Sequence, residues 1–396
     1  MKEKTSTTPI PLEQEVAPAS GRRMFSIGLP RCNDATERRF PLTPESARIL
    51  VDEGFTLRME SDAGQSIHYT DGQYSRAGVR VGSREEALGC DIVLHLAPLA
   101  PPDIRKMRRG AMLLTLFSLH RQTLASVREL LSRGIIAIAL DLIEDTAGNT
   151  PFADILAEID GRAAMARASS LLADADHGKG ILLGGVAGVK PCEVAVIGSD
   201  LAACSAARSA AGLGATVRML DNDIYRLRAA SRELGQAVVV SSLHPRALAD
   251  VIRTSDVIVY TPVSPELRLG ADETASMKRG VIIFDLSSEF GRAFPSLPAV
   301  DLALSSPVDI APGKNSRVCY VNAGSLVPRT AAMALSDAFI TMMRDIVTCE
   351  GLTNALKLLP GLQRAAYTFA GKPVNPDIAA IAGMRHVDIN IYLTLS

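Results

Sequence analysis

The chain has 396 residues, of which 47% are hydrophobic and 21% are charged, and its formal net charge is −1. This length is enough for two domains with full hydrophobic cores, and the near-neutral charge argues against a nucleic-acid partner or a polybasic membrane-binding surface. The six cysteines form no C-x-x-C pair and have no histidines at metal-ligand spacing. We therefore expect reduced thiols, a cytoplasmic protein and no metal site.

The first 23 residues are polar and rich in Pro, Ser and Thr, without the apolar core of a signal peptide, so residues 1–23 are predicted to be a flexible tail. No stretch has the length and apolar character of a membrane-spanning helix. From Met24 onward, short apolar runs alternate with amphipathic segments. Strands are predicted at 25–29, 56–60, 92–96, 112–117 and 135–140, and helices at 44–54, 84–88, 102–108 and 124–133. Buried strands joined by helices indicate a parallel sheet covered on both faces.

The second half repeats this alternation. An Ala-rich segment at 151–175 has helical spacing and is predicted to link two domains. Further strands are expected at 193–197, 216–220, 237–240, 257–261, 281–286 and 318–322, followed by a helix at 325–350. The remaining segment, 352–396, has no clear pattern. The predicted fold class is α/β, with two doubly wound Rossmann-like domains and a cleft between them.

One strand–helix–strand unit carries the outline of a dinucleotide-binding motif. The strand at 193–197 breaks at Gly198 and leads into a helix of small residues, and the next strand ends at Asp221, 23 positions after that glycine. An acid at this place normally accepts hydrogen bonds from the adenosine ribose hydroxyls. The unit therefore predicts a bound nucleotide, and NAD in preference to NADP.

The glycine motif is incomplete, because the chain reads Gly198-Ser-Asp-Leu-Ala-Ala203 where G-x-G-x-x-G is expected. The second glycine normally lets backbone N–H groups approach the diphosphate, and here it is Asp200. A carboxylate about 4 Å from a phosphate charge costs roughly 1 kcal/mol in water and about 4 kcal/mol at an effective dielectric constant of 20. The alternative interpretation is a βαβ unit that binds no nucleotide.

Several strings in chain order resemble the family of alanine dehydrogenase and the α-subunit of proton-translocating transhydrogenase. They span about residues 24–345. The strings are Glu37-Arg-Arg-Phe-Pro-Leu-Thr-Pro44, Asp62-Ala-Gly64, Leu183-Gly-Gly-Val-Ala-Gly-Val-Lys-Pro191, Gly212-Leu-Gly-Ala-Thr-Val217, and Asn322 with Val327-Pro-Arg-Thr330. The resemblance implies that the C-terminal segment completes the first domain, giving a substrate domain of about 24–150 plus 325–396 and an NAD-binding domain of 151–324.

The resemblance also implies site residues. Arg39 matches the arginine that holds the substrate carboxylate, a task suited to a planar guanidinium. Glu289 matches the acid after the fifth strand of the nucleotide domain. Residues implied to hold the cofactor are Gly198, Asp221, Asn322 and Arg226, the last beside the adenosine ribose.

Three positions depart from the family pattern. Ala97 stands where the family has its catalytic lysine, Ser118 where it has its active-site histidine, and Ala157 where a serine touches the diphosphate. Two histidines are candidates to replace the missing proton-handling groups. His95 faces the same side of its strand as Ala97, and His120 follows Ser118 at a strand end.

The leading hypothesis is an NAD-dependent oxidoreductase that acts on an amino acid, an imine or a 2-oxo acid, with a small-molecule carboxylate as substrate and without ordinary alanine dehydrogenase activity. Two alternatives stay open: a lyase- or cyclase-like enzyme that retains NAD without net redox chemistry, and an inactive family member that serves as a binding subunit. The resemblance implies a homo-oligomer.

Overall fold

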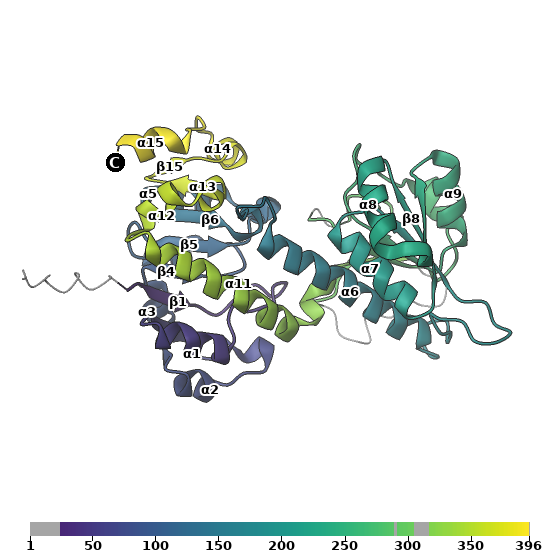
Figure 1. The fold of residues 1–396 in the computed structure, drawn as a ribbon, viewed down its shortest axis with the longest axis horizontal. Helices are drawn as coiled ribbons and strands as arrows, with labels where there is room; N and C mark the ends of the chain where they lie inside the picture. Colours follow the sequence, from purple (N-terminus) through teal and green to yellow (C-terminus); the bar gives the residue numbers. More distant parts are fainter. Residues whose placement is uncertain (1–23, 289–290, 305–316, 396) are drawn as a thin grey trace, which may run out of the picture.

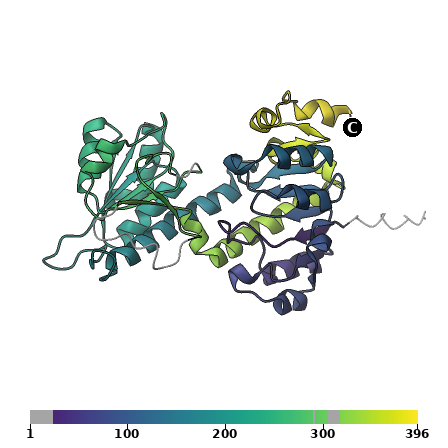
Figure 2. The ribbon, with the colours of Figure 1, turned by 180° about the vertical axis from the view of Figure 1, so that it is seen from behind.

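The computed structural model describes residues 24–288, 291–304 and 317–395. Figure 1 shows two α/β lobes side by side, and Figure 2 shows the same arrangement from behind. The first lobe is built from the N-terminal part of the chain and from its C-terminal segment, coloured purple-blue and yellow-green. The second lobe, in teal and green, is formed by the residues between them. Two lobes of parallel sheet and helix agree with the predicted fold class.

The first lobe contains an eight-stranded sheet in the order β15-β14-β6-β5-β4-β1-β2-β3. Its strands are β1 (Ser26–Leu29), β2 (Thr56–Glu60), β3 (Arg80–Gly82), β4 (Ile92–Leu94), β5 (Met112–Thr115), β6 (Ile136–Ala139), β14 (Ala366–Phe369) and β15 (Lys372–Pro373). The first six strands pair in parallel, and β14 joins β6 in antiparallel orientation. The segment without a clear sequence pattern thus supplies one edge of this sheet.

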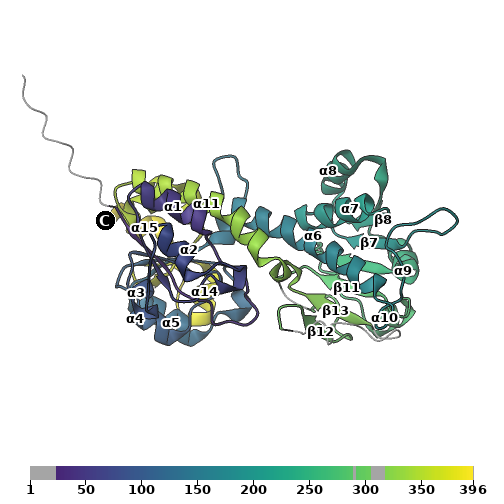
Figure 3. The same ribbon diagram turned by 90° about the horizontal axis from the view of Figure 1, so that it is seen from below.

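Helices cover both faces of this sheet (Figure 3). One face carries α1 (Pro44–Asp52) and α11 (Pro328–Thr348), and the other carries α3 (Arg84–Leu88), α4 (Pro101–Lys106), α5 (Leu124–Ser132) and α14 (Pro376–Ala382). The remaining elements of this lobe are α2 (Asp71–Arg76), α12 (Leu352–Leu358), α13 (Pro360–Arg364), α15 (Ile389–Leu395), and the 3-10 turns η1 (Gln65–Ile67), η2 (Leu119–Arg121) and η3 (Leu140–Leu142).

The second lobe contains a seven-stranded parallel sheet in the order β12-β13-β11-β10-β7-β8-β9. Its strands are β7 (Glu193–Ile197), β8 (Thr216–Asp221), β9 (Val238–Ser242), β10 (Val257–Tyr260), β11 (Ile282–Asp285), β12 (Ala299–Asp301) and β13 (Val318–Val321). Leaving aside β12, this is the strand order of doubly wound dinucleotide-binding sheets.

Two buried clusters lie on opposite faces of the second sheet. One joins the sheet to α6 (Pro151–Ala173), α7 (Leu201–Gly212) and α8 (Ile224–Leu234), and the other joins it to α9 (Pro245–Thr254) and to the end of α10 (Ala271–Ser276). Short 3-10 turns are η4 (Gly235–Ala237) and η5 (Ala323–Leu326). Two long helices, α6 and α11, pass between the lobes, and Phe152 of α6 stacks on Phe339 of α11 with ring centroids 4.9 Å apart.

Local sequence signals account for several boundaries. Thr43 caps α1 by accepting the Ser46 N–H, and Pro44 occupies the first helical position. Gly54, at φ +99°, turns the chain from α1 into β2. The helix expected at 325–350 begins at Pro328, because the preceding residues form η5. The long helix expected at 151–175 is α6.

Candidate functional site

A cavity of about 340 Å³ lies between the two lobes. The first lobe contributes side chains that follow β1, β5 and β6, and the second contributes side chains from the ends of β7, β11 and β13. The polar residues among them are Thr36, Glu37, Arg39, Ser118, His120, Arg121, Asp141, Asp160, Asp200, Asp285, Ser287, Ser288 and Asn322. The cavity is therefore shared by the carboxyl ends of two parallel sheets, where open α/β proteins bind their ligands.

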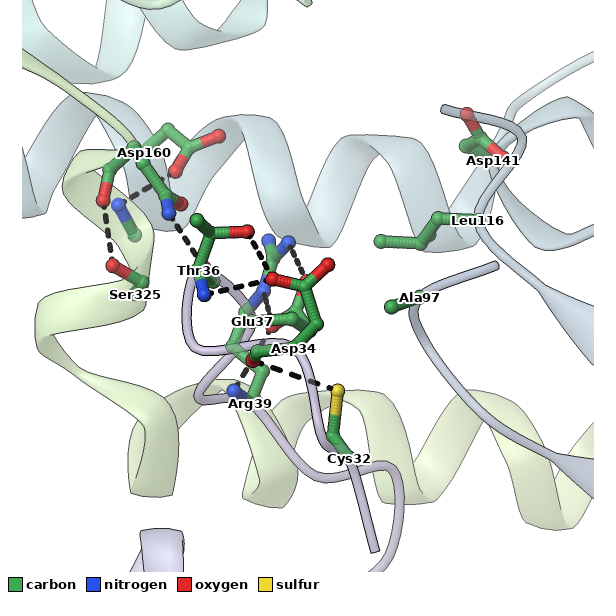
Figure 4. Close-up of polar contacts among 12 residues, drawn as sticks. Cys32, Asp34, Thr36, Glu37, Arg39, Ala97, Leu116, Asp141, Asp160 and Ser325 are labelled. Atoms are coloured by element: carbon green, nitrogen blue, oxygen red, sulfur yellow. Dashed lines mark hydrogen bonds and ion pairs between the residues drawn. The ribbon is translucent and has the colours of Figure 1, made fainter. Parts of the chain in front are cut away.

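Arg39 reaches this cavity, as the sequence predicted, but its guanidinium already holds a carboxylate. Arg39 Nε donates to Glu37 Oε1 at 2.8 Å, and Nη2 donates to Oε2 at 2.6 Å (Figure 4). Burial acts to lower the pKa of Arg39, and the charge and hydrogen bond of Glu37 outweigh it, so the pKa is raised. Arg39 thus stays charged. Its third nitrogen, Nη1, makes no hydrogen bond within the described part of the chain.

The structure separates the two candidate histidines. His120 lies in η2 at the cavity lining, and partial burial lowers its pKa. His95 is only 4% exposed and is absent from the lining. Its Nδ1 donates to the Ala97 carbonyl at 2.5 Å, and burial lowers its pKa. The strand expected at 92–96 ends at Leu94, so His95 and Ala97 lie in the turn after β4, and both are buried. Of the two histidines, His120 is the one that lines the cavity.

Ser118, which stands in the place of the family's histidine, lies at the cavity with φ +37°. A left-handed backbone at a non-glycine residue is strained, and such strain is common at functional sites. His120, two residues further along the chain in η2, lines the same cavity.

Asp200 occupies the amino-terminal end of α7, where a dinucleotide-binding fold receives its diphosphate. It is the helix N-cap, and its Oδ1 accepts the Ala203 N–H at 2.9 Å. Burial raises the pKa of Asp200. The hydrogen bond from the Ala203 N–H and the charge of the Arg226 guanidinium, 3.9 Å away, act to lower this pKa. The predicted adenosine-side cation, Arg226, thus faces a carboxylate of the protein itself.

Asp221 ends β8, as predicted, but its side chain is only 1% exposed. Ser199 Oγ donates to its Oδ2 at 2.5 Å, and the Asp223 N–H donates to its Oδ1 at 3.0 Å. Gly198 turns the chain at φ +111°, and a Cβ there would lie 2.0 Å from Thr261 Oγ1, so the glycine is required. The nucleotide-binding motif thus keeps its backbone turn at Gly198, but the Asp221 carboxylate is already occupied by hydrogen bonds from Ser199 and Asp223.

Asn322 follows β13 with φ +62° and connects the two lobes. Its Nδ2 donates to the Thr36 carbonyl at 2.6 Å and to Asp301 Oδ1 at 3.2 Å. It lines the cavity. Glu289, the remaining predicted site residue, lies outside the described residues.

Three cavity acids were not singled out from the sequence. Asp141 and Asp285 stand at the ends of β6 and β11, so their position after a buried strand was an available signal. Asp160 is different, because it lies within α6 between Ile159 and Gly161, far from any strand end. An acid on a helix stretch rich in buried residues was its only signal.

Two lobes of doubly wound sheet that share a cavity at their strand ends define a Rossmann-type two-domain protein. Residues 28–159 match the N-terminal domain of the alanine dehydrogenase/PNT family, and residues 164–376 match its C-terminal domain. The chain belongs to this family, as its motifs indicated. Alanine dehydrogenases of the family use NAD as cofactor.

Curated relatives cover nearly the whole chain. Alanine dehydrogenase of Geobacillus stearothermophilus is 28% identical over 379 residues, which is 93% of this chain and 100% of that protein. Alanine dehydrogenase of Staphylococcus saprophyticus is 26% identical over 370 residues, covering 92% of this chain and 98% of the relative. Both comparisons place the similarity in both domains.

Solved structures agree on the fold. An L-alanine dehydrogenase aligns with a TM-score of 0.77 at 24% identity, covering 90% of this chain and 98% of that one. A transhydrogenase from Sinorhizobium meliloti aligns with a TM-score of 0.71 at 21% identity, covering 89% and 99%. Within the described ranges, none of the helices is long and apolar enough to span a membrane. The same residues contain no group of three or more His, Cys, Asp or Glu side chains arranged for a metal ion.

Proposed function

We propose that this chain is an NAD-dependent oxidoreductase that acts on an amino acid, an imine or a 2-oxo acid, and that its reaction differs from ordinary alanine dehydrogenation. One observation carries the proposal: the cavity between the lobes unites Arg39 and His120 with Asp200 and Asn322 at the strand ends of a dinucleotide-binding sheet. A carboxylate anchor, a titratable group and a nucleotide domain are the components that this chemistry requires.

The residues present fit NAD once two side chains turn away. The backbone of Gly198 and the amino-terminal end of α7 would hold the diphosphate after Asp200 leaves the Ala203 N–H. Asp221 would take the adenosine ribose after Ser199 rotates, with Arg226 beside it. Bound NAD supplies a hydride acceptor. Asn322 is placed to bind the cofactor from the cavity side.

The chain's own residues have separable tasks in this proposal. Arg39 binds the substrate carboxylate through the N–H groups that Glu37 leaves unused, and Glu37 holds the guanidinium plane in place. His120 exchanges the proton of the amine or carbonyl, because its pKa is lowered and it reaches the cavity. Leu116 and Leu156 form an apolar part of the lining that limits access of water to the reacting carbon.

The test is turnover of NAD with a panel of amino acids, and of NADH with 2-oxo acids plus ammonia, followed at 340 nm. Sustained, substrate-dependent absorbance change supports a net oxidoreductase. Alanine, and pyruvate with ammonia, are expected to be poor substrates because Ala97 and Ser118 replace the proton-handling residues. Product formation without absorbance change points to an internal redox cycle instead.

A binding subunit without catalysis is the second candidate, favoured by the enclosed Asp221 and its bond to Ser199. Calorimetric titration with NAD and NADH distinguishes the two, since the binding-subunit hypothesis is supported if neither binds. We also propose a homo-oligomer in the cytoplasm. Light scattering that gives the 42.1 kDa monomer mass at micromolar concentrations would contradict the oligomer.

A further inference from the structure

The charges that line the cavity are unbalanced. Of the described lining residues, five are acidic and only two are arginines: the acids are Glu37, Asp141, Asp160, Asp200 and Asp285, and the arginines are Arg39 and Arg121. Both arginines already form ion pairs with carboxylates of the protein, Arg39 with Glu37 and Arg121 with Asp34. The positive charges in the lining are therefore largely neutralised before any ligand enters.

Two of the acidic side chains accept hydrogen bonds from backbone N–H groups of their own loop or helix. Asp285 accepts the Ser287 N–H and the Gly291 N–H, one on each oxygen and both at 2.9 Å, so it organises the loop after β11. Asp200 caps α7. These contacts leave Asp141 and Asp160 as the carboxylates with capacity to bind a ligand.

Asp160 is built into the cavity wall from α6. Its Oδ1 accepts the Gly324 N–H at 2.8 Å, and a Cβ on Gly324 would lie 2.1 Å from that oxygen, so glycine is needed for the approach. The other oxygen makes no hydrogen bond within residues 24–288, 291–304 and 317–395. Asp141 presents a similar arrangement, with Oδ1 accepting the Phe117 N–H at 2.8 Å. Each carboxylate is fixed through one oxygen.

Figure 4 shows Asp160 and Asp141 on either side of the Arg39–Glu37 pair. Both carboxylates are near enough to Arg39 to act on its charge electrostatically. Together with Glu37, these two carboxylates place three negative charges around the single positive charge of Arg39. A ligand with only a negative charge would be opposed here, and a positive group would be attracted, more strongly than in water because the site is partly desolvated.

Resting on the proposed function, we propose that the substrate is a basic amino acid or a closely related amine: besides the carboxylate bound by Arg39, it carries a primary ammonium or guanidinium group that Asp160 binds, while Asp141, on the opposite side of Arg39, adds to the attraction for a cation. An ammonium has three donors and a guanidinium has five, so either group can donate to the Asp160 oxygen that the Gly324 N–H leaves unused. The cavity volume of about 340 Å³ suits a small molecule of this kind. Asp160 and Asp141 are specificity determinants in this assignment.

Burial raises the pKa of both Asp160 and Asp141 in the absence of ligand. A bound cation stabilises their ionised forms, so ligand binding should release protons at any pH at which the free carboxyl groups are still partly protonated. Calorimetry in buffers of different ionisation enthalpy measures this release.

The experiment compares lysine with norleucine, which has the same carbon chain without the terminal amine. Binding to the full-length protein is measured by calorimetry with and without NAD, and turnover is measured separately at 340 nm. We expect lysine, ornithine or arginine to bind at least tenfold more tightly than norleucine, and glutamate to bind more weakly still. Equal or tighter binding of norleucine, or no binding of any basic compound at millimolar concentration, overturns the proposal.

Variants assign the preference to residues. Asp160→Asn keeps the acceptor for the Gly324 N–H and removes the charge, so the preference for lysine should fall about tenfold while norleucine binding stays constant. Glu158→Gln is the matched control, on the same helix but paired with Arg162. Asp141→Asn provides a second variant if the first does not fold. An unchanged lysine preference in both Asn variants overturns the assignment.

The two proposals fail separately. Lysine binding without any NADH formation refutes the oxidoreductase and leaves the cation site standing. NADH formation with neutral substrates alone refutes the cation site and leaves the oxidoreductase standing.

Discussion

The two lobes differ in how far their predicted ligand-binding groups are already occupied by other residues of the protein. On the first lobe, Arg39 is held by Glu37 and reaches the cavity, and one of its nitrogens has no hydrogen bond among the residues that the structure describes. On the second lobe, Asp221 is 1% exposed and both of its oxygens accept hydrogen bonds from the protein. A motif residue can therefore stand in its expected place and still need a partner to move before it binds a ligand.

The largest expected effect concerns Arg39. Truncating one partner of a desolvated charge pair costs on the order of 2–5 kcal/mol, so Arg39→Ala should lower kcat/KM by roughly a hundredfold or more. The affinity for NADH should stay nearly constant, because Arg39 belongs to the other lobe. The exposed neighbour Arg38→Ala is the control, measured in the same steady-state assay. Equal small effects at both positions would show that Arg39 anchors no substrate.

The second prediction tests the other lobe through Asp200. Asp200→Gly removes a carboxylate from the place of the diphosphate, and glycine remains an acceptable N-cap, so the fold should tolerate it. NADH should bind about tenfold more tightly, a gain of about 1.4 kcal/mol. Asp221→Ala should weaken binding. If fluorescence titration finds both affinities unchanged, the nucleotide site is elsewhere or absent.

A smaller effect is expected at Ser199, whose hydroxyl occupies Asp221. A hydrogen bond contributes about 0.5–1.5 kcal/mol, so Ser199→Ala should tighten NADH binding roughly two- to tenfold by freeing the carboxylate. Ser205→Ala is a suitable control, since Ser205 is buried on α7 away from Asp221 and its hydroxyl has no hydrogen-bond partner in the described structure. Weaker NADH binding by Ser199→Ala would mean that the serine itself contacts the cofactor.

The smallest effect is on stability and involves Asp160. Burial raises its pKa in the folded chain above the unfolded value of about 3.9, with Glu37 adding to the shift and Arg39 and the Gly324 N–H opposing it. The folded state therefore binds the proton more readily, and Asp160 costs stability above the raised pKa, a cost that disappears as the pH falls toward about 4. Asp160→Asn removes this dependence. Its Tm relative to the native chain should be higher at about pH 7 than at about pH 5, whereas Glu158→Gln should show no such trend.

Local signals in the sequence predicted most of the fold. The Thr43–Pro44 start and the Gly54 end of α1, and the apolar strands around Gly198, depend on neighbours within a few residues. β14 was not predicted, because this short strand pairs with β6, more than 200 positions earlier, and carries no strong alternation of its own. β15 is only two residues long and pairs with β14, so it too was missed.

The site was predicted less completely, since side-chain partners depend on tertiary packing. Of the residues that the sequence proposed, Arg39, His120 and Asn322 line the cavity, whereas Asp221 is absent from its lining. The sequence gave no sign that Ser199 bonds Asp221. The prediction that His95 shares a strand face with Ala97 was wrong, because β4 ends at Leu94 and both residues lie in the following turn, where both are buried. Asp160 could not be assigned, because its role depends on the approach of Gly324, 164 positions away.

The antiparallel pairing of β14 with β6 has a consequence for synthesis on the ribosome. The second lobe is continuous in sequence from β7 to β13, so it can fold as soon as that segment has emerged. The first lobe begins earlier but gains its edge strands and α11 only when the last part of the chain is released. The lobe translated first should therefore complete its folding last: in ribosome-bound chains just long enough for β13 to have left the exit tunnel, the second lobe should resist protease while the first is still cleaved.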